Sequence, residues 1–166
     1  MRQFDRLQMC LQWFNFSFIV NNIYRLFMTA YASSFQVTTD GFCDVHDITP
    51  SVQDVLSTSG LSNGIATVFI PGSTASITTI EYEQGAIEDL KKTIERIAPQ
   101  NIHYDHDARW GDGNGFSHVR AALLGPSLSV PFSHRKLRVG TWQQIILVDF
   151  DNRPRKREIL VHLVGD

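Results

Sequence analysis

Cysteine is scarce in this chain, and so is an excess of charge of either sign. The 166 residues include only Cys10 and Cys43, too few for the disulfide framework of a small secreted protein, so we expect a reducing, cytoplasmic setting. The formal net charge is −2 at pH 7, from 15 Lys and Arg against 17 Asp and Glu. A broad basic surface is therefore absent, and we expect no nucleic-acid partner.

Long hydrophobic runs are also missing. An aromatic, apolar stretch lies within residues 1–27, but polar residues interrupt it, and a membrane span needs about 20 consecutive apolar residues. We therefore expect no membrane partner. The stretch could be a signal peptide, because Ala30-Tyr31-Ala32 resembles a cleavage site, or it could precede a true start at Met28. We prefer the second reading, in which residues 1–27 are a non-domain N-terminal extension and residues 28–166 form the domain.

Hydrophobic residues make up 43% of the chain, enough for one core and no reason to divide it. Apolar residues at helical spacing predict a short helix after Asp47 and Pro50 and a longer one over Tyr82–Ala98. A long polar loop over 101–117 is expected to carry function. Apolar or β-branched runs predict strands over Thr29–Val37, Ile65–Ile70, Val119–Leu124, Leu128–Pro131, Thr141–Phe150 and Glu158–Val164. Two helices and a β-rich final third predict an α+β fold.

Small hydroxyl residues follow one of the predicted buried strands. Ser73 and Thr74 lie beside Gly72, where a backbone without a Cβ can approach an anion and hydroxyls can donate to it. This pattern predicts a phosphate cradle, and a tight turn is the alternative. Glu81 stands ahead of the long helix, where it could orient an imidazole, act as a ligand, or simply be favoured by the helix dipole.

Two histidines, His106 and His118, are candidates for a metal or phosphate site. Neutral imidazole is a common metal ligand, and protonated imidazole can hold an oxyanion or pass a proton. Their spacing of twelve residues matches no compact zinc motif. Trp142 and Gln143 could offer a stacking face and an amide to a ring such as a pyrimidine, although a tryptophan on a strand is more often core. His103 is expected at the surface.

Arginines supply the remaining candidates for phosphate binding. Arg120 and Arg135 could pair bidentately with phosphate or could equally be surface residues. The basic run Arg153–Arg157 is interpreted as a solvated turn before a final strand, and a contact with phosphate or with a trimer partner is the alternative.

Several of these segments, taken in order, resemble the YjbQ family, also called UPF0047. The resemblance rests on Gly72-Ser-Thr-Ala-Ser76 followed by Ile80-Glu81, on Tyr104-Asp-His106, on Ser117-His118 and on Gly140-Thr-Trp-Gln143. The family pattern has a histidine where this chain has Gly72, and an asparagine where it has Ile80. The resemblance begins only at about Phe35, which agrees with a start at Met28.

This resemblance implies a mixed β-sandwich with two main helices that associates as a homotrimer. It also implies activity of the thiamine-phosphate-synthase type, which joins a pyrimidine diphosphate to a thiazole phosphate and releases pyrophosphate. His106, His118 and Glu81 would be catalytic, while Ser73, Thr74, Trp142 and Gln143 would bind the substrates, with a divalent metal such as Mg²⁺ or Zn²⁺ at the two histidines. The alternatives are a non-catalytic trimer that binds a small phosphorylated metabolite or a metal ion, and a metal-dependent phosphohydrolase.

Overall fold

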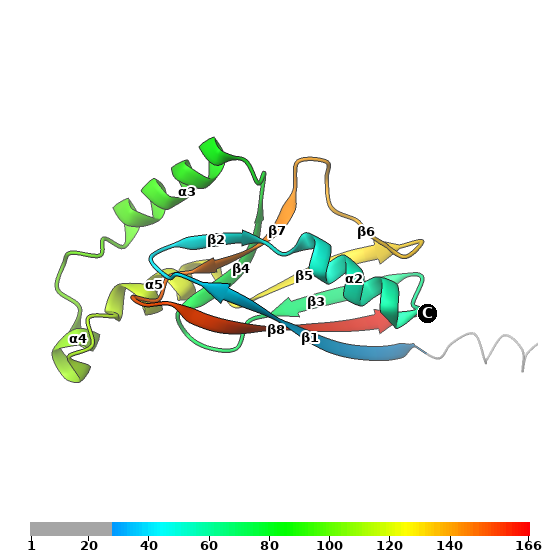
Figure 1. Ribbon diagram of the computed structural model, residues 1–166, viewed down its shortest axis with the longest axis horizontal. Helices are drawn as coiled ribbons and strands as arrows, with labels where there is room; N and C mark the ends of the chain where they lie inside the picture. Colours follow the sequence, from blue (N-terminus) through cyan, green and yellow to red (C-terminus); the bar gives the residue numbers. More distant parts are fainter. Residues whose placement is uncertain (1–27) are drawn as a thin grey trace, which may run out of the picture.

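The computed structural model describes residues 28–166, and two antiparallel sheets form its framework (Figure 1). The larger sheet has the strand order β1-β8-β3-β5-β6, with β1 (Thr29–Thr39), β8 (Arg155–Gly165), β3 (Gly64–Phe69), β5 (Ser127–Ser133) and β6 (Lys136–Leu137). The smaller sheet has the order β2-β7-β4, with β2 (Asp44–Asp47), β7 (Gln144–Asp149) and β4 (Ala75–Ile80).

The helices occupy the connections between strands. They are α2 (Thr49–Ser59), α3 (Gln84–Ile97), α4 (Asp105–Trp110) and α5 (Gly115–Leu124). Before α2, the Asp47 carboxylate accepts a hydrogen bond from the Thr49 N–H at 2.8 Å, and Pro50 occupies the first turn. Before α3, the Glu83 carboxylate accepts from two free N–H groups of the first turn. The two helices predicted from hydrophobic spacing are confirmed.

The core lies between the two sheets. Strand β8 alternates buried and half-exposed or exposed residues, as expected where only one face of a strand is covered. Its inward residues Ile159, Val161 and Leu163 share one hydrophobic cluster with Ile145 and Leu147 of β7. The two sheets therefore pack face to face.

The smaller sheet is covered on its other face by helices. Ile146 and Val148 of β7 form a second hydrophobic cluster with Ile94 of α3 and Ala121 of α5. Burial on both faces explains why the sequence of β7 is continuously apolar instead of alternating. With two antiparallel sheets and helices in the connections between strands, the predicted α+β class is confirmed.

One predicted strand is wrong. Residues Val119–Leu124 belong to α5, and the predicted loop over 101–117 contains α4 and the first turn of α5. Helix α5 lies on β4, where the Ser76 hydroxyl donates to the Ala121 carbonyl at 2.9 Å. A short apolar run has no periodicity that separates a buried strand from a buried helix, so the segment is a helix because of how it packs on β4.

The predicted N-terminal extension, residues 1–27, lies outside the described residues. Among residues 28–166, no helix combines the length and the apolar character that crossing a membrane requires.

Candidate functional site

Three segments meet at one end of the smaller sheet: the turn between β7 and β8, the start of β4, and the start of α5 (Figure 1). The Phe150 N–H donates to the Thr74 carbonyl at 2.9 Å. The Ser117 hydroxyl donates to the Phe150 carbonyl at 2.6 Å, and the Asn152 N–H donates to the Asn114 side chain at 3.2 Å. These bonds fix the β7–β8 turn against both of its neighbours.

The two candidate histidines come together at this end. His106 lies on α4 and His118 on α5, with ring centroids 4.3 Å apart and planes tilted by 42°. The Nε2 atom of His106 lies 3.4 Å from an Asp112 carboxylate oxygen, and both imidazoles are partly exposed. The structure therefore pairs two groups that are twelve residues apart in sequence, with an acceptor for one of them.

The electrostatic setting of His118 favours its neutral form. Burial lowers the pKa of His118 below its ordinary value, and the positive charge of His106 adds to that effect. The negative charges of Asp112, Asp151 and Asp107 act in the opposite direction but are outweighed. A neutral imidazole beside a second imidazole can accept a proton or approach an anion once protonated.

Gly115 allows the histidine pair to form. Its N–H donates to an Asp107 carboxylate oxygen at 2.7 Å, which joins α4 to the start of α5. A Cβ at this position would lie 2.5 Å from the Cβ of Tyr104, closer than side chains approach one another. The absence of a side chain at Gly115 therefore permits the close packing of α4 on α5.

A buried charge network continues from the turn into β4 and β8. Arg157 donates from Nε and Nη2 to the two Asp149 carboxylate oxygens, each at 2.6 Å. Its Nη2 also donates to the Thr74 hydroxyl at 2.8 Å, and that hydroxyl donates to Asp151 at 2.8 Å. The Asp151 carboxylate is further paired with Arg155 at 2.8 Å. The hydrogen of the Thr74 hydroxyl is thus already committed to Asp151, and Thr74 positions the network.

One nitrogen of Arg157 stays available. Among residues 28–166, Nη1 has no hydrogen-bond partner, whereas Nε and Nη2 are fully used. Gly72 adopts a φ of +118°, and a Cβ built there would have Nη1 at 3.6 Å as its one neighbouring atom within 4 Å in the described chain. Ser73, the next residue, is exposed and makes no side-chain hydrogen bond to these residues. A guanidinium nitrogen and an open backbone therefore face the same space, and the exposed Ser73 follows directly in the chain.

The other predicted site residues lie elsewhere in the protomer. Trp142 and Gln143 precede β7, Glu81 follows β4, and these two strands run antiparallel with Ile80 opposite Gln144. Thr74 lies at the opposite end of β4, roughly 23 Å from Glu81 at about 3.3 Å per residue. Within one protomer, Glu81, Trp142 and Gln143 are therefore not brought to the histidine pair.

The side chains at this second end are accessible. Trp142 is 72% exposed, so its alternative reading as a core residue is wrong. Gln143 donates to the Thr79 hydroxyl at 3.2 Å, and Glu81 is exposed. The cap of α3 is Glu83, and Glu81 lies three residues ahead of the helix start at Gln84.

Binding of a metal ion requires several ligand side chains close together. Within residues 28–166, no three side chains among His, Cys, Asp and Glu are arranged to hold a metal ion. His106 and His118 therefore lack a third ligand from the described part of their own protomer. The site offers two imidazoles and a guanidinium, which are groups for binding an anion and moving a proton.

Sequence reasoning did not predict that two arginines are buried. The run Arg153–Arg157 was interpreted as solvated, which is wrong for Arg157, whose side chain is 10% exposed. Arg157 occupies the inward face of β8 with Ile159, two residues on, so strand alternation was a usable signal. Arg120 is 3% exposed, so it is no surface arginine; its Nε donates to the Ala98 carbonyl at 2.9 Å. His103 is exposed, as predicted.

Taken together, fold and site define an α+β protein with paired imidazoles and a partly free guanidinium at one end of its smaller sheet. The profile of the family described as UPF0047 protein YjbQ-like matches residues 33–166, and the chain belongs to this family. It is 37% identical over 140 residues to a UPF0047 protein of Methanothermobacter thermautotrophicus, covering 84% of this chain and 96% of the relative.

Solved structures show the same fold. A YbjQ-like protein of unknown function from Sulfolobus solfataricus P2 superposes with a TM-score of 0.79 at 33% identity, covering 84% of this chain and 100% of the other. A hypothetical protein from Aeropyrum pernix K1 gives a TM-score of 0.76 at 30% identity, covering 82% and 99%. The family resemblance seen in the sequence is confirmed.

Proposed function

We propose that this chain binds small phosphorylated metabolites at the histidine pair and catalyses a transfer of the thiamine-phosphate-synthase type. In this reaction a thiazole phosphate displaces the diphosphate of a pyrimidine diphosphate, so that a carbon–nitrogen bond forms and pyrophosphate leaves. The observation that carries the proposal is the free Nη1 of Arg157 facing open space at Gly72, at the end of the sheet that also holds His106 and His118.

The proposed chemistry needs little covalent participation from the protein. The ring nitrogen of the thiazole supplies the new bond, and the departing pyrophosphate takes the bonding electrons, so the site must orient two rings and stabilise negative charge. In this proposal Arg157 Nη1 and the Ser73 hydroxyl donate to phosphate oxygens, because the Thr74 hydroxyl already donates to Asp151. His106 and His118 stabilise the leaving charge when protonated.

The second end of the sheet supplies the missing recognition groups in this proposal. Trp142 offers an exposed ring face, and Gln143 an amide, for a pyrimidine, while Glu81 offers a carboxylate to an imidazole. Because these groups lie at the other end of β4 and β7, the site is completed by a neighbouring copy in a homotrimer. The proposed active site is therefore shared between protomers.

The test is synthesis of thiamine phosphate by the full chain from the pyrimidine diphosphate and the thiazole phosphate in the presence of Mg²⁺. The variant His106→Gln/His118→Gln is expected to lose at least about 100-fold in rate, because positioned acids and charge-stabilising donors contribute that much. His162→Gln, which changes an exposed histidine on β8, is the matched control and should keep its rate. Equal rates in all three proteins, or no product at all, would overturn the synthase proposal.

A specific observation favours a second candidate function. The family pattern that the sequence resembles has a histidine where this chain has Gly72, so the resemblance implies one imidazole fewer at the end of the sheet that holds the pair. A non-catalytic binding protein for a phosphorylated metabolite needs the anion-binding groups but not that imidazole. Saturable binding of the thiazole phosphate, lost in Arg157→Lys and unaccompanied by product, would support this function over the transferase.

A further inference from the structure

A cleft lies on the other side of α5 from the histidine pair. It has a volume of about 940 Å³, within the usual range for small-molecule sites, and it opens between α3, the turn before β2 and helix α5. His118 and Arg120 are two positions apart on α5, about 200° around the helix, so one faces the histidine pair and the other lines the cleft. The cleft is therefore separate from the proposed active site.

Arg120 forms a prepared anion-binding group in this cleft. Its side chain is buried at 3% exposure, its Nε is bonded to the Ala98 carbonyl, and its guanidinium lies 4.8 Å over the Phe116 ring. Nη2 contacts Glu95, while Nη1 has no hydrogen-bond partner among residues 28–166, and Arg120 lines the cleft. A guanidinium held rigidly with one free N–H₂ group has the geometry that binds phosphate or carboxylate.

Positive charge dominates the wall of the cleft. Lys91, Lys92 and Arg96 of α3 join Arg120, against two acidic side chains, Asp89 and Glu95, so the lining carries two net positive charges. Burial raises the pKa of the Cys43 thiol to about 11, while the positive charges of Arg120 and Lys91 pull it downward. The positive charges of Arg120 and Lys91 therefore both reach the Cys43 side of the cleft, and Cys43 itself stays a neutral, protonated thiol.

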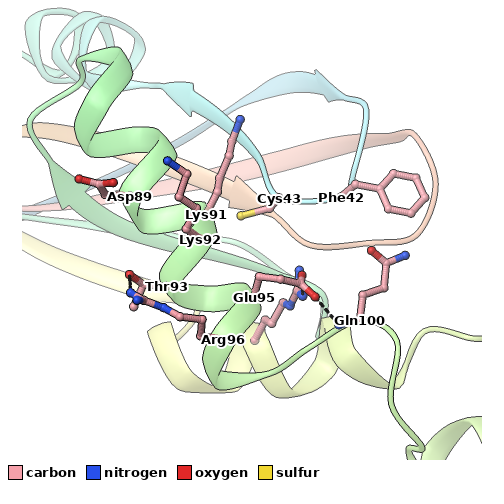
Figure 2. Close-up of a pocket in the computed structure, with 10 residues that line it drawn as sticks. Phe42, Cys43, Asp89, Lys91, Lys92, Thr93, Glu95, Arg96 and Gln100 are labelled. Carbon is pink, nitrogen blue, oxygen red and sulfur yellow. Dashed lines mark hydrogen bonds and ion pairs between the residues drawn. The ribbon is translucent and has the colours of Figure 1, made fainter.

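An aromatic ring completes the other side. Phe42 is 53% exposed and Cys43 is buried, and both hold left-handed backbone angles, with φ of 53° and 68°. Two consecutive non-glycine residues in this conformation are uncommon and are kept only where the surroundings hold them. Figure 2 shows the Cys43 sulfur pointing toward α3 and the Phe42 ring at the opposite end of the same turn. An exposed ring and a cationic wall thus flank one cavity.

We infer that this cleft is a second binding site, for a small molecule that joins an anionic group to a ring or other apolar body. The anion, phosphate or carboxylate, pairs with Arg120 Nη1 and the amines of α3, and the apolar body lies against Phe42. This site is independent of the proposed transferase or binding activity, because it uses none of the groups at the histidine pair.

The inference is tested by isothermal titration of the full chain with phenyl phosphate and benzoate, and with phenol as a neutral ring. The test variant is Lys92→Glu/Arg96→Glu, which reverses two exposed charges on the rim. Its matched control is Lys136→Glu/Arg138→Glu, the same charge change at exposed positions on and just after β6. The variant His106→Gln/His118→Gln serves to separate the cleft from the proposed active site.

We expect at least one of the two anions to bind and phenol not to bind. Affinity should fall roughly tenfold or more in Lys92→Glu/Arg96→Glu, and stay unchanged in the control and in the histidine variant. The anion that binds more tightly shows whether the cleft prefers a phosphate or a carboxylate. Loss of all binding in the histidine variant would assign it to the other site and overturn the inference. Equal affinity in the rim variant and its control, or no binding of either anion, would also overturn it. A third such result is a sedimentation experiment in which the rim variant alone loses self-association, because a second copy of the chain would then fill the cleft.

Discussion

At the scale of single residues, Arg157 connects the stability of the fold to the candidate site. Its guanidinium neutralises Asp149, which is fully buried, and holds Thr74 beside the open space at Gly72. Replacing it by glutamine leaves a buried carboxylate without its partner, so we expect Arg157→Gln to lower the free energy of unfolding by about 3–5 kcal/mol. Urea unfolding measures this change. Lys156→Gln, exposed on the same strand, should stay within about 0.5 kcal/mol, and an equally small loss for Arg157→Gln would contradict the buried network.

Asp151 gives the same network a pH dependence. Burial alone would raise the pKa of Asp151, but hydrogen bonds from Arg155 and Thr74 and the charges of both arginines outweigh it, so its pKa lies below the ordinary 3.8. A carboxyl group with a lowered pKa stabilises the fold above its ordinary value, and that contribution is lost as the pH falls through the lowered one. Urea unfolding from pH 6 to about pH 3 should therefore show a steeper loss of stability in the natural chain than in Asp151→Asn. Identical slopes would show that Asp151 does not carry the effect.

The two histidines of the pair are expected to influence each other's protonation. The pKa of His118 is lowered by burial and by the positive charge of His106, so removing that charge should raise it. We expect the NMR-detected pKa of His118 to increase in His106→Gln, and phosphate-ester binding to extend to higher pH if the protonated ring holds the anion. His103→Gln, which changes an exposed ring paired only with Asp105, is the control. An unchanged pKa would mean that the two rings do not interact electrostatically.

The sequence predicted those site residues whose role follows from their residue type alone. His106, His118 and Ser73 were proposed as candidates, and the structure brings the two histidines together. Arg157 was misjudged because its burial depends on Asp149 and Thr74, which lie 8 and 83 positions away in the chain. A run of basic residues says nothing about which member finds a buried carboxylate.

At the scale of elements, the packing of α4 on α5 sets the geometry of the histidine pair. Gly115 sits where a Cβ would meet the Tyr104 Cβ at 2.5 Å, so Gly115→Ala must push α4 away from α5. We expect a loss of about 1–3 kcal/mol in the free energy of unfolding, measured in urea, together with weaker binding of the thiazole phosphate. Ala122→Ser, exposed on α5, should leave both properties unchanged. Full stability in Gly115→Ala would show that the two helices can pack without this contact.

The elements themselves differ in how far the sequence determines them. Helices α2 and α3 were predicted because their apolar residues repeat at helical spacing and because Pro50 and turn residues mark the ends of α2. Residues Val119–Leu124 of helix α5 were mistaken for a strand because this short run is apolar apart from Arg120 and is too short to show helical spacing. Contacts with β4 and with the β7–β8 turn, which are distant in sequence, determine that this segment is a helix and not a strand.

At the scale of the whole molecule, the predicted site residues divide between two ends of the smaller sheet. The histidine pair and Arg157 lie at one end of β4 and β7, while Glu81, Trp142 and Gln143 lie at the other. An antiparallel pair of strands cannot bring its own two ends together, so these groups can cooperate only across an interface between copies. In the proposed homotrimer, a head-to-tail interface would place the histidine end of one protomer against the Glu81 end of the next.

This arrangement predicts that two inactive variants restore each other. Glu81→Gln and His118→Gln should each lose activity alone, because each removes one half of every shared site. After unfolding and joint refolding in equal amounts, about a quarter of the interfaces combine an intact histidine end with an intact Glu81 end, so roughly a quarter of the activity should return. Joint refolding of His106→Gln with His118→Gln is the control, because both changes lie at the same end and no interface becomes intact. Recovery in both mixtures, or in neither, would contradict a site shared between copies, while recovery in the first alone requires Glu81 of one protomer to act with His118 of another.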